Sequence, residues 1–261
     1  MRRGRRAVTA TRIQALRAAL RAGAFDGWIQ PHADEYQGEY LPPSAERLAW
    51  LTGFTGSAGP AVVLMEKAAA FSDGRYTLQL REQIDLDIFE PRHSVEEPAG
   101  DWIAANLPAG AVLAYDPWLS TEAEVKRYEA AVAKAGGRLV AADLNLVDGI
   151  WTDRPAPPKA PIAPHPLVYA GRASAEKRRD LAAALAKDKL DAALLTAPDG
   201  IAWLLNVRGG DVEHTPLPLS FAILARDGGV DWFVDDVKLP AETLAWLGDG
   251  VTRHPPTAFA P

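Results

Sequence analysis

The chain has 261 residues, of which 48% are hydrophobic and 24% are charged, and its formal net charge is −6. These values are typical of a globular protein long enough for two domains, and the acidic balance disfavours binding to nucleic acid or to an anionic membrane. The sequence contains no cysteine, which excludes disulfides, thiolate metal ligands and cysteine nucleophiles and fits a cytoplasmic location. It also contains no run of about 18 apolar residues that would span a membrane.

Helical and strand-like patterns alternate through the first half of the chain. Ile13, Leu16 and Leu20 share one face of a predicted helix at 12–21. Thr121 and Glu124 form the capping-box pattern that begins a second helix. Strands are predicted at 25–30, 61–64, 68–73, 111–114 and 138–141. Such alternation predicts an α/β fold in which helices pack on a mixed sheet.

A proline-rich segment follows, with six prolines between positions 155 and 166. Neither a helix nor a central strand tolerates that density, because proline lacks the backbone donor and fixes φ. We therefore predict a semi-rigid linker at 152–166 between one domain at 9–151 and a second at 167–261.

The second half repeats the plan of the first. A predicted helix at 176–187 and a predicted strand at 190–195 correspond to the helix and strand at the start of the first half. The tripeptide Ala-Trp-Leu occurs at 49–51 and again at 202–204, each time before a glycine-rich turn. Two strand-like runs follow each turn, and in the second half they lie at 220–224 and 230–235. Duplication explains this order better than chance, and the absence of a closing element after position 251 predicts a second domain truncated at or near its end.

The loop at 206–216 is the first candidate site. It lies between two apolar segments, where exposed functional groups are usually found. Arg208 offers a fork of donors suited to a carboxylate or a peptide carbonyl, and Asp211 and His214 add groups that hold charge or protons. The alternative interpretation is a glycine turn with a surface Arg/Asp pair.

A second polar loop, at 73–76, contains Asp73, Arg75 and Tyr76. It is either a recognition site or a turn that stabilises the end of a strand. Neither polar loop pairs a nucleophile with a base, so both suit recognition better than bond breaking, and we assign no catalytic residue.

Other catalytic motifs are missing from the sequence. In the segment 56–59 the glycine directly precedes Ser57, which does not match the Gly-x-Ser-x-Gly nucleophile elbow, and no phosphate-binding P-loop follows. The five histidines are scattered and no His-Glu-x-x-His occurs, so no metal ligand is predicted in this chain.

Four segments, at 46–59, 71–76, 145–155 and 201–216, resemble in order the three-domain Xaa-Pro aminopeptidases of the creatinase/prolidase superfamily. The resemblance implies two successive creatinase N-terminal-like α/β domains. In that family a third, pita-bread domain binds two Mn²⁺ or similar ions through two Asp, one His and two Glu residues. No position of this chain matches those ligands, so we expect the catalytic domain and both ions to be absent here.

The resemblance further implies a non-catalytic N-terminal region that limits access to the catalytic cleft of a metallo-aminopeptidase. Arg208 and Asp211 would hold peptide backbone or terminal charge, and His214 would line the entrance, with Arg75 and Tyr76 as further substrate contacts. The alternative role of the Arg208 loop is to pack against the catalytic domain. Expected partners are short peptides with proline at the second position, the protein's own C-terminal catalytic domain, and a second copy in a homodimer.

Two other hypotheses remain open. The chain is a stand-alone peptide-binding or regulatory protein without catalysis, or it is a hydrolase that uses Ser57. The second of these needs a histidine and an acid beside the serine, which the sequence does not place nearby.

Overall fold

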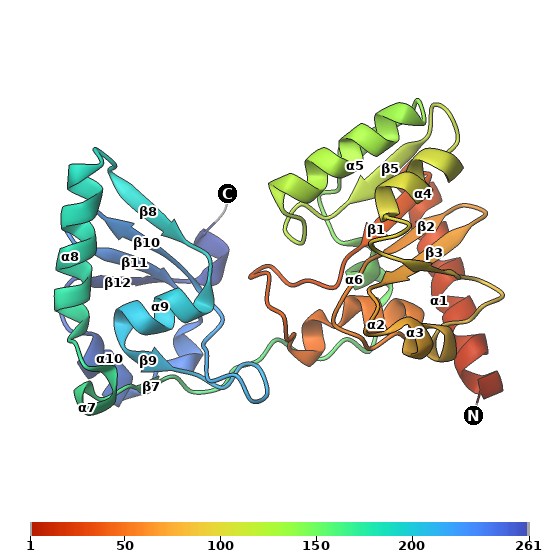
Figure 1. The fold of residues 1–261 in the computed structure, drawn as a ribbon. Coiled ribbons are helices and arrows are strands. Elements are labelled where there is room, and N and C mark those ends of the chain that lie inside the picture. Colours follow the sequence, from red (N-terminus) through yellow and green to blue (C-terminus); the bar gives the residue numbers. More distant parts are fainter. Residues whose placement is uncertain (1, 260–261) are drawn as a thin grey trace. The chain divides into compact units, whose positions relative to one another are not determined.

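The computed structural model describes residues 2–259, with side chains from residue 7 onward. The chain divides into two compact units, Met1–Ala156 and Pro157–Pro261, which are coloured red to green and green to blue in Figure 1. The second unit thus begins inside the segment predicted as a linker.

The first unit is built on a mixed six-stranded sheet of order β4-β3-β2-β1-β5-β6. Its strands are β1 (Gly27–Gln30), β2 (Ala61–Leu64), β3 (Ala68–Ser72), β4 (Glu90–His93), β5 (Val112–Tyr115) and β6 (Arg138–Ala141). The pairs β1–β2 and β2–β3 are antiparallel, whereas β1–β5, β3–β4 and β5–β6 are parallel. Every predicted strand of this half is confirmed. The sequence analysis missed β4, because Glu-Pro-Arg-His has no apolar pattern and its conformation depends on pairing with β3.

Helices cover both faces of this sheet. They are α1 (Arg2–Ala22), α2 (Arg47–Thr52), α3 (Thr77–Gln83), α4 (Ala99–Asn106), α5 (Glu122–Lys134) and α6 (Leu146–Ile150), with a 3₁₀ turn η1 (Pro43–Ala45). Trp28 and Val63 point into one core with α1, α2, α3 and α6, while their neighbours Ile29 and Val62 point into the other with α4 and α5. Successive strand residues therefore contribute to opposite cores, which explains why β2 and β3 are buried along their whole length.

The capping box of α5 is confirmed. Thr121 Oγ1 accepts the backbone N–H of Glu124 at 3.3 Å, and Glu124 Oε2 accepts the backbone N–H of Thr121 at 2.9 Å. These bonds satisfy two helix N–H groups that would otherwise lack a partner.

The second unit has a four-stranded sheet of order β12-β11-β10-β8. Its strands are β7 (Ala163–Pro164), β8 (Ala192–Leu195), β9 (Val207–Arg208), β10 (Phe221–Ala225), β11 (Val230–Phe233) and β12 (Val251–His254). Its helices are α7 (Leu167–Ala170), α8 (Ser174–Lys187), α9 (Pro198–Leu205) and α10 (Ala241–Leu247), with 3₁₀ turns η2 (Asp236–Lys238) and η3 (Pro256–Ala258). The strands β7 and β9 form a separate two-stranded ribbon.

The predicted duplication has a counterpart in the strand directions. Along both β1-β2-β3-β4 and β8-β10-β11-β12, the first two pairings are antiparallel and the third is parallel. The resemblance extends to single contacts. The guanidinium of Arg12 lies 4.4 Å from the ring centre of Trp50, and the ammonium of Lys177 lies 4.4 Å from that of Trp203. Each cation also donates a hydrogen bond to the carbonyl of its tryptophan.

Two expectations about the second half are wrong. The segment after position 251 is not an irregular tail, because Val251–His254 forms β12 parallel to β11 and is followed by η3. The proline-rich segment is not only a spacer, because Ile162 is buried in the core of the second unit and Ala163 pairs with Arg208.

One face of the second sheet is covered less than the other. The core of this unit includes Ala222 and Leu224 together with side chains of α8 and α9. On β8, Ala193 and Leu195 pack against that core, whereas the intervening Leu194 is 59% exposed.

Candidate functional site

The loop at 206–216 is fixed at its base by Asp211. The side chain of Asp211 is fully buried, and its Oδ2 accepts hydrogen bonds from Lys238 Nζ at 2.8 Å and from the backbone N–H of Leu219 at 2.7 Å. An acid that is already paired in this way fixes the loop to η2 and to the segment just before β10. The geometry makes Asp211 an anchor of the loop, in contrast to the direct peptide contact expected from the sequence.

Gly209 allows the two ends of this loop to approach closely. Its N–H donates to the carbonyl of Pro216 at 3.2 Å, and a side chain at this position would lie 2.7 Å from the backbone nitrogen of Pro218. Beyond it, Val212 and Thr215 form an isolated bridge that closes the tip. The turn is therefore narrow and held by backbone contacts.

The tip presents His214 to solvent. Its side chain is 90% exposed, its φ is +58°, and its Nε2 lies 3.4 Å from Glu213. Arg208 lies at the other end of the loop, half-buried, with Nη1 donating to the carbonyl of Val207 at 2.8 Å. The three predicted residues are thus not gathered at one point: Asp211 is inside, His214 is at the tip and Arg208 is on the β7–β9 ribbon.

Sequence reasoning missed the groups that surround Arg208. Asn206 is the left-handed C-cap of α9, with φ of +52°. Its Oδ1 accepts from Lys177 Nζ at 2.6 Å, its Nδ2 donates to the carbonyl of Arg172 at 2.8 Å, and its own carbonyl accepts from the N–H of His165 at 2.7 Å. Asn206 therefore connects α8, α9 and the β7 segment. The left-handed preference of asparagine after a buried helix is the one signal in the sequence that points to this role.

Electrostatics in this cluster disfavour further positive charge. Burial lowers the pKa of Lys177, and Arg208 and Arg172 lower it further. Burial likewise lowers the pKa of His165, with added repulsion from Arg208 and Lys177. Both effects have the sign expected of cationic groups gathered without a counter-charge.

The polar loop at 73–76 is occupied by contacts within itself. Arg75 Nη2 lies 2.8 Å from Asp73 Oδ2, and the Arg75 guanidinium lies 5.1 Å from the ring centre of Tyr76. Arg75 holds the pKa of Asp73 below its ordinary value. The Tyr76 hydroxyl lies 2.9 Å from Ser57 Oγ, and within residues 2–259 no histidine or acid joins that serine. These contacts stabilise a strand end and provide no activated nucleophile.

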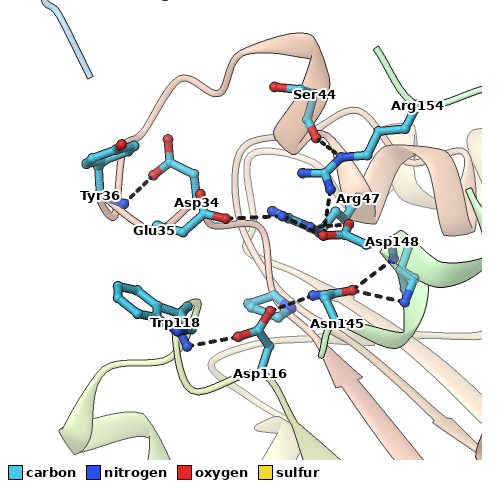
Figure 2. A network of polar contacts seen from close by, with 12 residues as sticks. Asp34, Glu35, Tyr36, Ser44, Arg47, Asp116, Trp118, Asn145, Asp148 and Arg154 are labelled. Atoms are coloured by element: carbon cyan, nitrogen blue, oxygen red, sulfur yellow. Dashed lines mark hydrogen bonds and ion pairs between the residues drawn. The ribbon is translucent and has the colours of Figure 1, made fainter. Parts of the chain in front are cut away.

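A network of ion pairs around the buried Arg47 in the first unit, shown in Figure 2, was not predicted. Arg47 donates to both oxygens of Asp148 at 2.7 and 3.0 Å and to Glu35 at 3.1 Å. Arg154 lies 2.6 Å from Asp148 and donates to the carbonyl of Ser44 at 2.7 Å. Residues more than one hundred positions apart along the chain therefore hold α2, α6 and the 31–46 loop together.

Two acids beside this network are also buried. Asp34 Oδ1 accepts from the N–H groups of Tyr36 and Gly38 at 3.0 and 2.9 Å, while Asp116 Oδ2 accepts from Asn145 Nδ2 at 2.8 Å. Burial raises the pKa of both carboxyl groups. The arrangement orders the loops that follow β1 and β5.

Among the described residues, no three side chains of the metal-binding types lie close enough together to hold an ion. No helix in the described part of the chain is long and apolar enough to cross a membrane.

Models of known protein families match the two halves of the chain separately. The family model for the creatinase/prolidase N-terminal domain matches residues 12–148, and a second model of the same description matches 153–261. The chain belongs to the creatinase/prolidase N-terminal domain family. The two creatinase-type domains are the duplicated units seen in the strand order, which confirms the fold class predicted from the sequence.

Curated relatives of these two domains include a probable Xaa-Pro aminopeptidase P of Ajellomyces dermatitidis, 37% identical over 250 residues. Another, from Paracoccidioides brasiliensis, is 35% identical over 254 residues. The matches cover 95% and 96% of this chain but only 40% and 41% of the relatives. The chain thus spans about two fifths of the length of the relatives that it matches.

A solved structure similar to both domains is the X-prolyl aminopeptidase of Caenorhabditis elegans, described as a cytosolic enzyme with a di-nuclear active site. It superposes with a TM-score of 0.89 at 29% identity and covers 95% of this chain, which corresponds to 42% of the nematode protein.

Proposed function

We propose that this chain is the N-terminal, non-catalytic region of a metal-dependent Xaa-Pro aminopeptidase, which removes an N-terminal residue that precedes proline. The observation that carries the proposal is the match of both domains, in order, to two fifths of proteins named for that activity. In this proposal the region shapes access to the cleft and contributes to peptide recognition in the cytoplasm. Two Mn²⁺ or similar ions would be held by a separate C-terminal catalytic domain.

The geometry suggests different roles for the predicted site residues. Arg208 is half-buried with donors to spare, and we assign it direct contact with the peptide. His214 at the exposed tip is placed at the entrance, and Asp211 holds the loop from inside. Arg75 and Tyr76 are proposed as secondary contacts at most, because their charge and hydroxyl are already paired.

The partly covered face of the second sheet supports docking of the catalytic domain. Leu194 is 59% exposed on an edge strand of that sheet, and burying such a side chain contributes about 1.5–3 kcal/mol. We propose that the parent protein's own catalytic domain covers this face, and that the parent forms a homodimer.

The test is cleavage of an Ala-Pro peptide in the presence of Mn²⁺, by this chain and by a chain extended beyond residue 261 in the natural reading frame. We expect cleavage only by the longer chain. In that chain, Arg208→Gln should raise KM more than it lowers kcat, whereas the surface change Arg226→Gln should leave both unchanged. Cleavage by the 261-residue chain would refute the non-catalytic assignment, and a stop codon directly after Pro261 would instead favour a stand-alone peptide-binding protein.

A further inference from the structure

Arg208 and His165 share one face of the β7–β9 ribbon. Ala163 lies opposite Arg208 in the antiparallel register, and the N–H of His165 donates to the carbonyl of Asn206 at 2.7 Å, one rung further along. His165 directly follows β7, and continuing the register by one residue places its side chain on the same side as Ala163 and Arg208. Diagonal neighbours in a two-stranded ribbon are about 7–8 Å apart, and Arg208 is half-buried at this position.

Lys177 places a buried positive charge beside this face. Only 3% of the residue is exposed, and its Nζ donates to the carbonyl of Trp203 at 2.8 Å and to Asn206 Oδ1 at 2.6 Å. Both acceptors are neutral oxygens, so the ammonium is solvated without being neutralised. Buried charge acts through a medium that screens it poorly, and its field reaches the neighbouring residues.

The acids nearby are used elsewhere. Asp180 pairs with Arg172, Glu176 accepts the N–H of Ala173, and Glu213 lies beside His214. Within the part of the chain that the structure describes, no carboxylate forms an ion pair with Arg208, His165 or Lys177. A half-buried arginine of this kind has Nε and Nη2 free to grip a planar anion with two parallel hydrogen bonds.

We propose that Arg208 and His165 form a carboxylate-binding site, with Lys177 as the positive charge beneath it and Asn206 as the residue that positions Lys177 and the backbone of His165. The ligand class is a peptide with a free carboxylate, either its C-terminus or an acidic side chain. This inference rests on peptide recognition by the proposed function, and it names the group that is recognised. It does not require that cleavage occur.

The test uses this chain and three peptides at matched ionic strength: Ala-Pro-Ala, its C-terminal amide, and Ala-Pro-Glu amide. NMR of the His165 ring follows binding, because a bound carboxylate opposes the repulsion from Arg208 and Lys177 and raises the pKa of His165. We expect Ala-Pro-Ala to shift the His165 signal and the amide to bind at least about tenfold more weakly, as for loss of a charge-assisted hydrogen bond. Response to Ala-Pro-Glu amide as well would identify a site that accepts side-chain carboxylates.

Matched variants separate the site from general charge effects. Arg208→Gln should weaken Ala-Pro-Ala binding by about tenfold or more, while Arg226→Gln removes a surface arginine of the same unit and should leave it unchanged. Equal binding of the acid and the amide, or unchanged binding in Arg208→Gln, would overturn the proposal. If this chain binds the carboxylate but the extended chain cleaves no Xaa-Pro bond, the carboxylate site stands and the proposed aminopeptidase function is refuted.

Discussion

Replacing Lys238 by methionine should destabilise the second unit by about 3–5 kcal/mol, which is the usual cost of removing one partner from a buried ion pair. The side chains of Lys238 and Asp211 are 8% and 0% exposed, and their charged atoms lie 2.8 Å apart. Methionine fills similar space but leaves the Asp211 carboxylate inside the protein with only the Leu219 N–H as a partner. Since single domains unfold with about 5–15 kcal/mol, this loss is a large fraction of the total.

Replacing Asp211, the other partner of the pair, should reduce the stability of the second unit less. Asp211→Asn keeps an acceptor for the Leu219 N–H and leaves the charge on lysine, whose four-carbon stem lets the ammonium move toward water. Asp211 has no such freedom, because its short side chain is fixed at the base of the loop. The double variant Lys238→Met/Asp211→Asn removes both charges and should recover most of the loss.

Urea unfolding followed by hydrogen exchange in β10 and β11 measures these differences within the second unit alone. Exchange of the Leu219 amide should accelerate in Lys238→Met before global unfolding, because that N–H is bound to the perturbed carboxylate. A loss below about 1 kcal/mol in Lys238→Met, which is typical of exposed pairs, would refute the description of Asp211 as a dry anchor of the loop.

Three further changes test separate features of the fold. Gly209→Ala should cost about 1–3 kcal/mol through overpacking against Pro218, whereas Gly200→Ala, inside α9 with nothing within 4 Å, should gain about 0.5–1 kcal/mol; thermal unfolding gives both signs. Asp34→Asn should stabilise the first unit at pH 7, because burial raises the pKa of Asp34 and its stabilising contribution, present below the ordinary value of 3.8, is lost as pH rises through the raised value. Urea titrations should show no gain in stability from Asp34→Asn at a pH below the ordinary pKa of 3.8. A gain of the same size at every pH would contradict a raised pKa for Asp34. Thr121→Ala should lose about 1 kcal/mol by removing the cap of α5, and an unchanged melting temperature would show that the cap contributes nothing.

The local sequence pattern was sufficient to predict elements whose residues are continuously buried or whose contacts lie within one turn. The apolar runs that became β2 and β3 are buried on both faces, and the Thr121–Glu124 capping box acts within one turn of helix. The strand β12 was missed because Val-Thr-Arg-His is mostly polar and is held by pairing with β11. No local pattern distinguishes it from an irregular tail.

The site was predicted less well because its contacts are long-range. The sequence identified Arg208, Asp211 and His214 as a group, but Asp211 is paired with Lys238, 27 residues away. The lysine and histidine beside Arg208 come from α8 and from the proline-rich segment. Composition shows which side chains are able to bind an anion, whereas only the packing shows which of them lack a counter-charge.

The duplicated plan explains why the cationic cluster belongs to the second unit. In both units a cation of the long helix before the first strand of the sheet (α1 or α8) stacks on a tryptophan and binds its carbonyl. In both, the short helix that carries this tryptophan ends in a left-handed residue. In the first unit that residue is Gly53, which has no side chain, and the cation is Arg12. In the second unit it is Asn206, whose amide binds Lys177 on one side and the Arg172 backbone on the other. The left-handed residue at the end of this helix therefore carries a polar side chain in the second unit and none in the first, and the site we propose lies where the two units differ.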